Sequence, residues 1–222
     1  MCIRDRSKIG TVGPALPGVG VRLADDGEIE VRGVNVLKEY WNNPAATADA
    51  FSEGGWFRTG DIGSFDSEGF LTITGRKKEI IVTAGGKNVA PAALEDPIRA
   101  NPIIGQVVVV GDQRPFISAL ITLDPEMLPT WLANAGLPKE MSLVEASKND
   151  AVRAEIQRAV DAANARVSRA ESIRKFTVLD SEWTEASGHL TPKMSIKRNV
   201  IMSDFADEIA AIYDLSLIHI SE

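Results

Sequence analysis

The sequence has a single cysteine, Cys2, in 222 residues. One thiol cannot build a disulfide framework, and this composition fits a reducing, cytoplasmic location. No apolar run approaches the roughly 18 residues that a membrane-spanning helix needs, and the charged start lacks the apolar core of a secretory signal. These absences exclude a disulfide-stapled secreted domain and predict that the chain has no transmembrane segment.

Positive charge and histidine are also scarce. The chain has 24 Lys and Arg against 31 Asp and Glu, a net charge of −7, which excludes the basic footprint of a nucleic-acid binder. Two short basic clusters, 76–78 and 193–198, indicate small anionic ligands instead. Of the two histidines, His189 follows a glycine in a polar loop and His219 is near the end, and no carboxylate or thiol pattern surrounds either. We therefore expect no metal site and no Ser-His-Asp triad.

The first 74 residues predict a β-rich region. Two alternating apolar runs flank Asp25-Asp26-Gly27, which is a strong hairpin signal. Residues 38–52 predict a short helix that begins near Pro44. A tight turn at Ser67-Glu68-Gly69 then separates two further strands. This region resembles an incomplete β subdomain.

From about residue 79 the pattern alternates between strand and helix. Residues 91–101 predict a helix in which Pro97 marks a kink or an early end. Continuous branched apolar runs in "GQVVVVGD" and "FISALITLD" predict buried strands, and "IRKFTVLD" predicts another. Residues 125–170 read as helical, 188–201 as a loop or short strand, and 204–214 as a last helix. The predicted fold class is α+β.

Four segments carry a family resemblance, in one order and with consistent spacing. They are "GTVGPALPGVGVRLADDGEIEVRG", "WFRTGD", "GRKKEIIVTAGGKNVAP" and "LTPKMSIKRNV". Together they resemble the late motifs of the adenylate-forming superfamily, and the likeness covers about residues 9–214. It implies that 7–74 is the end of the large AMP-binding domain, 75–78 a hinge, and 79–214 a mobile C-terminal domain.

The segment "RTGD" suits the sugar of a nucleotide. Ionised Asp61 only accepts hydrogen bonds, so it suits the two donor hydroxyls of a ribose. The resemblance gives Asp61 this role, with Thr59 and Gly60 beside it, and places Arg76 against the same nucleotide. The alternative is an ordinary Thr-Gly-Asp turn between strands.

The hinge and the passage for coenzyme A follow in the chain. Lys78 matches the position about which the C-terminal domain of the family pivots. Gly85 and Gly86, with Lys87, match a loop that lines the path of the pantetheine arm, where glycine permits close backbone approach. An ordinary turn is the alternative here as well.

The segment "LTPKMSIKR" is expected to hold the catalytic lysine, which stabilises charge on carboxylate and phosphate oxygens during adenylation. Gapless alignment with long-chain ligases puts Ser195 at the lysine position, and a serine cannot supply the charge. The candidates are therefore Lys197, which a one-residue gap favours slightly, and Lys193. The alternative is a basic surface loop.

The branch that this pattern resembles most is the long-chain fatty acid–CoA ligases. The resemblance implies fatty acid, ATP and CoA as substrates, with Mg²⁺ ligands mainly upstream, and allows peripheral membrane contact. No phosphate loop of the family is present, so we expect the chain to be inactive alone. Two alternatives stay open: an adenylation domain that loads a carrier protein, and a non-catalytic interaction module.

Three further expectations concern single residues and the ends of the chain. Trp131 and Trp183 are expected to be packing residues. The ends, 1–6 and 215–222, resemble adapter read-through, and we exclude them from the fold. We therefore expect the natural chain to extend upstream.

Overall fold

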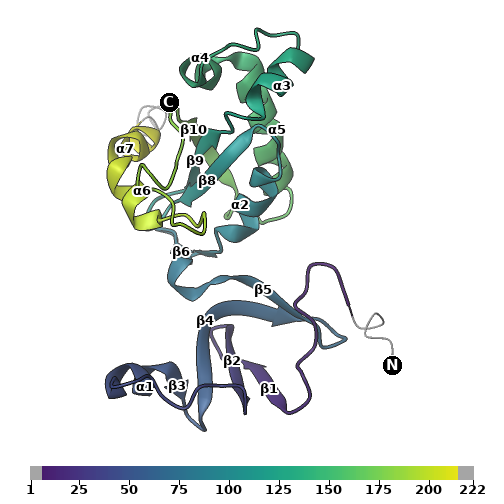
Figure 1. The fold of residues 1–222 in the computed structure, drawn as a ribbon, viewed down its shortest axis with the longest axis vertical. Helices are drawn as coiled ribbons and strands as arrows, with labels where there is room; N and C mark the ends of the chain where they lie inside the picture. The colour runs from purple at the N-terminus through teal and green to yellow at the C-terminus, as the bar shows by residue number, and fades with distance from the viewer. Residues whose placement is uncertain (1–6, 215–222) are drawn as a thin grey trace. The chain divides into compact units, whose positions relative to one another are not determined.

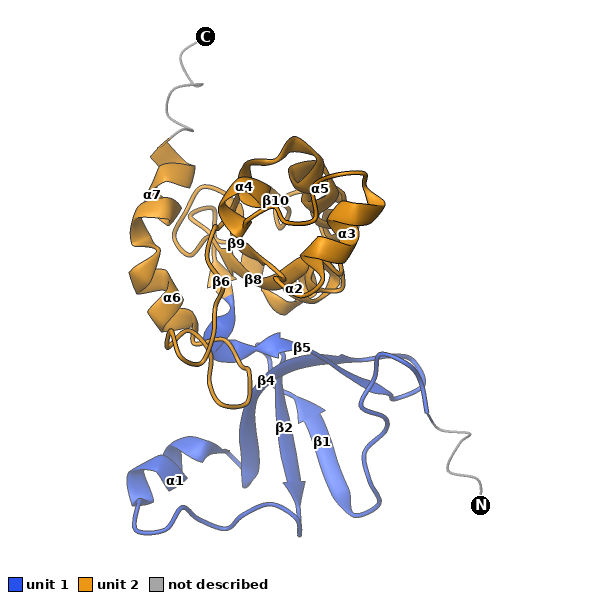
Figure 2. Cartoon of the chain, turned by 45° about the horizontal axis from the view of Figure 1, so that its top comes forward, with its two compact units in different colours: residues 1–80 blue, residues 81–222 orange. Residues whose placement is uncertain are grey.

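The computed structural model describes residues 7–214 and divides the chain into two compact units, 1–80 and 81–222 (Figures 1 and 2). The suspected foreign ends, with Cys2 and His219, lie outside the described residues. No helix among residues 7–214 is long and apolar enough to cross a membrane. The chain mixes helix and sheet, so the predicted α+β class is confirmed.

Unit 1 is an antiparallel sheet with one short helix. Its elements are β1 (Val19–Leu23), β2 (Glu28–Gly33), α1 (Pro44–Ala50), β3 (Phe51–Ser52), β4 (Trp56–Phe65) and β5 (Leu71–Arg76). The strands follow the order β1-β2-β4-β3, and β5 also pairs with β4. Both predicted hairpins are present, because the turns at 24–27 and 66–70 are closed by backbone hydrogen bonds.

The helix expected over 38–52 is shorter than predicted. Asn43 caps it by accepting a hydrogen bond from the Ala46 amide, so α1 begins at Pro44. It ends at Ala50, because Phe51 and Ser52 pair with β4 as a strand. Pairing with a neighbouring strand therefore overrides local helix propensity at this point.

Unit 1 has a small core of its own. Its buried apolar side chains are Ile29 and Leu71, whereas several large apolar side chains are exposed, including Trp41 at 89% and Val34 at 100%. A sheet with so much exposed apolar surface is expected to pack against other protein. The assignment of 7–74 to the end of a larger domain stays a prediction.

Unit 2 begins with a small hairpin and a helix, and its centre is a three-stranded sheet. Its elements are β6 (Ile81–Val82), β7 (Asn88–Val89), α2 (Ala92–Arg99), β8 (Ile104–Val110), β9 (Ile117–Leu123), α3 (Leu128–Asn134), α4 (Leu143–Lys148), α5 (Asp150–Asn164), β10 (Ile173–Val178), α6 (Arg198–Asp204) and α7 (Ala206–Asp214). In the order β10-β9-β8, β9 pairs antiparallel with β8 and parallel with β10.

Helices cover both faces of this sheet. Val107 and Val109 of β8 pack with α2 and α5, while Val108 and Val110 belong to a second cluster with α6 and α7 (Figure 1). All seven residues of β9 are buried, which explains its continuous apolar run. The three predicted strands of this unit are therefore present.

The helical region expected over 125–170 is divided into three helices. α3 ends before Gly136, which has a φ of 70°. Ser142 and Glu145 form a capping box that starts α4, and Asn149 caps α5 through its side chain. Capping residues thus set these boundaries within a sequence that has helical composition throughout.

Two other expectations are corrected. Pro97 does not end its helix early, since α2 continues to Arg99; the carbonyl four residues earlier belongs to exposed Ala93, where water can replace the lost amide. The last helical region begins at Arg198 instead of 204, and it is divided at Phe205 into α6 and α7.

Candidate functional site

Asp61 and Arg76 lie opposite each other on neighbouring strands of unit 1. The antiparallel register of β4 and β5 pairs their Cα atoms directly. The Nε of Arg76 lies 2.8 Å from the Oδ1 of Asp61. Asp61 is 23% exposed and Arg76 65%, so a ligand can reach both groups. The two residues that the resemblance assigns to the nucleotide are therefore adjacent.

The β-bulge of β4 before Asp61 is held by specific hydrogen bonds. The Thr59 hydroxyl donates to the carbonyl of Ile29 at 2.7 Å and accepts from the amide of Asp61 at 3.1 Å. Gly60 has a φ of 74°, a conformation that favours glycine. Thr59 and Gly60 thus shape the backbone that carries the Asp61 carboxylate.

Glu28 supports this bulge, and the sequence analysis did not identify it. Its side chain is 6% exposed; Oε1 accepts from the Gly60 amide at 3.0 Å and Oε2 from the Lys77 ammonium at 2.8 Å. A carboxylate that is buried to this degree needs hydrogen-bond and ion-pair partners, because burying an unpaired charge is costly. The signal was present in the sequence, because Glu28 and Glu30 alternate with apolar residues in a strand and so share one face.

Lys77 is held by two carboxylates. Its ammonium also pairs with Asp26, and these two carboxylates raise the pKa of Lys77 above 10.5, Asp26 being the larger cause. The same hydrogen bond lowers the pKa of the Asp26 carboxyl below 3.8. Lys77 therefore connects the end of β5 to the first hairpin of unit 1.

Lys78 lies in the 3-10 turn Lys77–Glu79, two residues before the end of unit 1 at Ile80. Its side chain is exposed, and it forms no ion pair with the described residues. This position does not test the hinge role, which stays a prediction.

Gly85 and Gly86 form the turn of the β6–β7 hairpin in unit 2. The Gly86 amide donates to the Thr83 carbonyl at 2.8 Å, and Gly86 has a φ of 76°. Gly85 has no such backbone requirement, and a Cβ there would meet only Thr83, at 3.9 Å. The Lys87 ammonium lies 3.3 Å from Glu171. The turn is open to a ligand, and only Gly86 needs glycine for its backbone.

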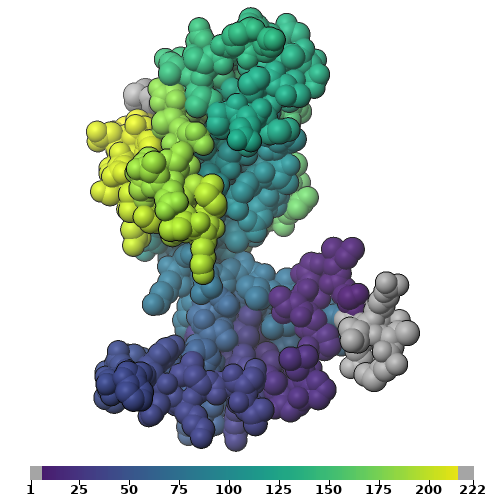
Figure 3. Space-filling model, viewed as in Figure 1, coloured from purple at the N-terminus to yellow at the C-terminus, as the bar shows by residue number. Residues whose placement is uncertain are grey.

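Lys193 and Lys197 belong to a hairpin formed by residues 189–197, here called the lysine hairpin. Its ends are joined by the Lys197 amide, which donates to the His189 carbonyl at 2.8 Å. Leu190 is buried in the core of unit 2, and Ile196 packs against it. The yellow-green segment that follows β10 protrudes from the surface of unit 2 in the space-filling view (Figure 3).

Both candidate lysines are accessible. Lys193 lies in the turn of the hairpin and Lys197 at its end, directly before α6. Both are exposed, and neither ammonium is paired with any residue between 7 and 214. Ser195, at the position where long-chain ligases carry lysine, is exposed as well. Either ammonium is thus free to meet an anionic group.

An ion pair fixes the end of the lysine hairpin to the core. Arg198 donates to both carboxylate oxygens of Glu95, at 2.8 and 2.9 Å, and to the carbonyl of Val109 at 3.0 Å. Glu95 is only 5% exposed and also accepts from the Val109 amide at 2.7 Å. This contact joins α2, β8 and the first residue of α6.

His189 has a carboxylate neighbour that the sequence did not reveal. Its Nε2 lies 3.1 Å from Asp204, and its Nδ1 lies 2.8 Å from the Ser187 hydroxyl. Ser187 is also hydrogen-bonded to Thr184 within a local turn, and the His189 ring packs between Trp183 and Phe205. This cluster accounts for how the base of the lysine hairpin is held.

The two tryptophans singled out in the sequence are packing residues in the structure. Trp183 is 2% exposed, and Trp131 packs against the larger core of unit 2. No group of three or more His, Cys, Asp or Glu side chains within residues 7–214 could hold a metal ion.

Comparison with known proteins defines the family. The model of the AMP-binding enzyme C-terminal domain matches residues 78–216. This chain therefore belongs to the AMP-binding, adenylate-forming enzymes through that domain.

Relatives of known sequence are fatty acid–CoA ligases. The long-chain-fatty-acid–CoA ligase FadD15 of Mycobacterium tuberculosis is 56% identical over 93% of this chain and 34% of its own length. The long-chain-fatty-acid–CoA ligase ACSBG2 of Gallus gallus is 36% identical over 84% of this chain and 27% of its own length. The chain thus spans about a third of the length of the curated relatives that it matches.

Solved structures show the same fold. ATP-bound MatB from Rhodopseudomonas palustris has a TM-score of 0.61 at 27% identity, over 89% of this chain and 36% of that one. The A domain of a carboxylic acid reductase from Segniliparus rugosus, in complex with AMP, has a TM-score of 0.70 at 20% identity, over 91% of this chain and 32% of that one. At this identity the second likeness concerns the fold alone.

Proposed function

We propose that this chain supplies the C-terminal part of an ATP-dependent long-chain fatty acid–CoA ligase. Such an enzyme joins a fatty acid carboxylate to AMP with release of pyrophosphate, and the CoA thiolate then displaces AMP. The proposal rests on membership of the AMP-binding family and on 56% identity to a ligase of this type. One observation in the structure carries it, the cross-strand pair of Asp61 and Arg76.

This pair suits the sugar of an adenosine nucleotide. The two ribose hydroxyls both donate hydrogen bonds, and the Asp61 carboxylate only accepts them. The long, exposed side chain of Arg76 can leave Asp61 for a ribose or phosphate oxygen, because an ion pair this exposed contributes little stability. The bulge of β4 at Thr59 and Gly60, held by Glu28, keeps the carboxylate in place for the exchange.

The lysine hairpin would serve the first half-reaction. An ammonium group that stabilises negative charge on the carboxylate and phosphate oxygens must be free of other partners. Both Lys197 and Lys193 meet this condition among the described residues. We retain Lys197 as the first candidate from the sequence, with Lys193 as the second.

The turn at Gly85 and Gly86, with Lys87, would serve the second half-reaction by lining the path of CoA. The C-terminal domain would rotate about Lys78 between the two steps. It would present the lysine hairpin for the first step and this turn for the second. The open surface beside both glycines supports this role, since a Cβ at Gly86 would meet nothing within 4 Å.

Magnesium and cellular location complete the proposal. The described residues offer no cluster that fits a metal ion, so we assign Mg²⁺ to ATP and to residues outside this chain. A cytoplasmic location, with peripheral contact to a membrane surface, remains part of the proposal.

A chimera tests the function. Residues 7–214 would replace the matching third of the 56% identical ligase, and acyl-CoA formation from palmitate, ATP and CoA would be measured. We expect the chimera to form palmitoyl-CoA and the 222-residue chain alone to show no ATP–pyrophosphate exchange. A soluble, folded chimera with no activity would contradict the proposal, as would robust exchange by the chain alone.

The same chimera separates the alternatives. Replacing CoA with a phosphopantetheinylated carrier protein should lower thioester formation strongly if CoA is the acceptor. Faster transfer to the carrier protein would favour an adenylation domain of the carrier-loading type. An interaction module would support neither reaction.

A further inference from the structure

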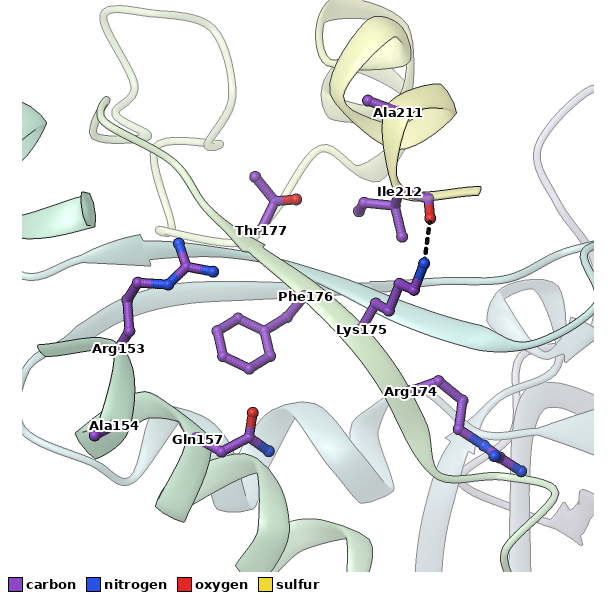
Figure 4. A pocket seen from close by; sticks show the side chains of 9 residues that line it. All are labelled: Arg153, Ala154, Gln157, Arg174, Lys175, Phe176, Thr177, Ala211 and Ile212. Carbon is purple, nitrogen blue, oxygen red and sulfur yellow. Dashed lines mark hydrogen bonds between the residues drawn. The ribbon is translucent and has the colours of Figure 1, made fainter. Parts of the chain in front are cut away.

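One edge of the sheet in unit 2 borders an open pocket. The pocket has a volume of about 600 Å³ and is lined by α5, β10 and the last turn of α7. In Figure 4, β10 runs between α5, which carries Arg153 and Gln157, and the end of α7, which carries Ile212. We call it the edge pocket. All its residues belong to unit 2, and none is part of the proposed nucleotide, lysine or CoA sites.

The backbone of β10 is unpaired along this edge. Within the described residues β10 pairs only with β9. Leu179 donates its amide to the Ile121 carbonyl of β9, and alternate residues of a strand turn their backbone groups to opposite sides. The N–H and C=O of Phe176 and Val178 therefore point away from β9, and no residue of the described chain bonds them. Phe176 lies in the edge pocket.

Side chains close a backbone position on each edge of the same sheet. On the opposite edge, the N–H of Val109 donates to Glu95 and its C=O accepts from Arg198. At the start of β10, Asn164 bonds both the N–H and the C=O of Ile173, at 2.8 and 3.0 Å. Beyond Ile173 this protection stops, so the edge at Phe176 is open to a partner.

The edge pocket is positively charged in an acidic protein. Arg153, Arg174 and Lys175 line it, and none of its lining residues is acidic. None of the three forms an ion pair with the described residues; each reaches a backbone carbonyl at 3.4 Å, and the Lys175 ammonium also lies over the Phe116 ring, 5.7 Å from its centroid. The whole chain has a net charge of −7, so this concentration of unpaired cations selects for an anionic partner.

We propose that the edge pocket binds an extended acidic peptide segment of a partner protein, which adds to β10 as a fourth strand. A peptide backbone supplies both the acceptor for the Phe176 N–H and the donor for its C=O, whereas a phosphate or sulfate ion supplies acceptors alone. Residues 175–178 span about 13 Å at the usual strand rise, enough for four peptide residues.

The side chains define the pattern of that peptide. In a strand, alternate side chains point to opposite faces, and each face of the added strand would meet a cation and an apolar group, Arg153 with Phe176 beside α5 and Lys175 with Ile212 beside α7. Phe176 and Ile212 offer that apolar surface (Figure 4). The expected ligand therefore combines Asp or Glu with Val, Ile or Thr. This inference is independent of the ligase proposal.

Fluorescence anisotropy with the 222-residue chain tests the proposal. The probe is a fluorescein-labelled hexapeptide, Glu-Val-Glu-Thr-Glu-Val, with blocked ends. Two matched probes replace every Glu with Lys or methylate alternate backbone amides. We expect the acidic probe to bind at least tenfold more tightly than either matched probe. Backbone amide signals of Phe176 and Val178 in NMR spectra should shift on binding and exchange more slowly with solvent.

Charge-reversal variants locate the site. The double variant Arg153→Glu/Arg174→Glu should weaken binding of the acidic probe at least tenfold, while Lys139→Glu, in the α3–α4 loop, should change it less than twofold. Circular dichroism melting shows whether each variant is folded, and the NMR shifts provide a measure that needs no variant.

Three results would overturn the proposal. Equal binding of the acidic and Lys-containing probes, or binding of neither, would show that the cations only protect the edge against aggregation. The N-methylated acidic probe could bind as tightly as the unmodified one, which would make the site a simple anion site. If inorganic phosphate displaced the labelled probe with the same affinity as the unlabelled peptide does, the site would again be a simple anion site.

Discussion

The Glu95–Arg198 pair offers a prediction with a magnitude that follows from the structure. Glu95 is 5% exposed. Its carboxylate accepts a hydrogen bond from the Val109 amide, and each of its two oxygens accepts one from Arg198. Arg198→Met would leave a buried carboxylate with only the Val109 amide as partner. Breaking a buried pair in this way costs about 3–5 kcal/mol. The Arg198 side chain is 22% exposed, so water reaches the vacated space, and we expect a loss of about 3 kcal/mol.

A second variant separates charge from hydrogen bonding. Glu95→Gln keeps an acceptor oxygen for the Val109 amide but removes the negative charge and one of the two oxygens that accept from Arg198, which should cost about 1–2 kcal/mol. Lys193→Met is the matched control, since Lys193 is exposed and has no partner among the described residues; it should change stability by less than about 0.5 kcal/mol.

Urea unfolding followed by circular dichroism at 222 nm measures these losses. Among residues 7–214, every α-helix except α1 lies in unit 2, so the signal reports mainly on that unit. A loss below about 1 kcal/mol for Arg198→Met, or an equal loss for the Lys193 control, would refute the reasoning that this pair anchors α6 to α2 and β8.

Three further predictions concern local contacts. Gly86→Ala should destabilise the chain by about 1 kcal/mol in urea unfolding because of its positive φ, while Gly85→Ala should be nearly neutral; equal effects would contradict this. Asn164→Ala should cost about 2 kcal/mol, since it removes both hydrogen bonds to the start of β10, and amides there should exchange faster; unchanged exchange would exclude the role. Lys77 lowers the pKa of Asp26, so the stability from this pair is present above the unfolded pKa and is lost as the pH falls through the lowered folded value. The urea midpoint of unit 1 should therefore fall more between pH 5 and pH 2 in the wild type than in the Asp26→Asn variant. The difference should be small, because the side chains of Lys77 and Asp26 are both about half exposed.

Strands and turns were predicted well because their signals are local. Asp26-Gly27 between alternating runs specifies a hairpin, and the continuous apolar run of β9 specifies a buried strand. The adjacency of Asp61 and Arg76 follows from the hairpin between them, so the sequence contained that contact as well.

Errors arose where a capping residue or a distant partner determines the structure. Asn149 ends one helix and caps the next, although its neighbours all have helical composition. Glu28 and Lys77 are 49 residues apart, and His189 and Asp204 belong to different elements, so no local pattern reveals either contact. Strand pairing and tertiary packing supply the information that the sequence analysis lacked.

The central claim is that Asp61 and Arg76 hold the ribose of an adenosine nucleotide. The most direct measurement is fatty-acid-dependent ATP–pyrophosphate exchange by the chimera with Asp61→Ala, beside Asp66→Ala as a control at the exposed β4–β5 turn. Loss of two charged hydrogen bonds to the ribose should lower kcat/KM for ATP by about 100-fold or more. The Asp66 variant should stay within about threefold of the parent. Equal activity of the Asp61 variant and its parent, in a folded chimera, would contradict the account.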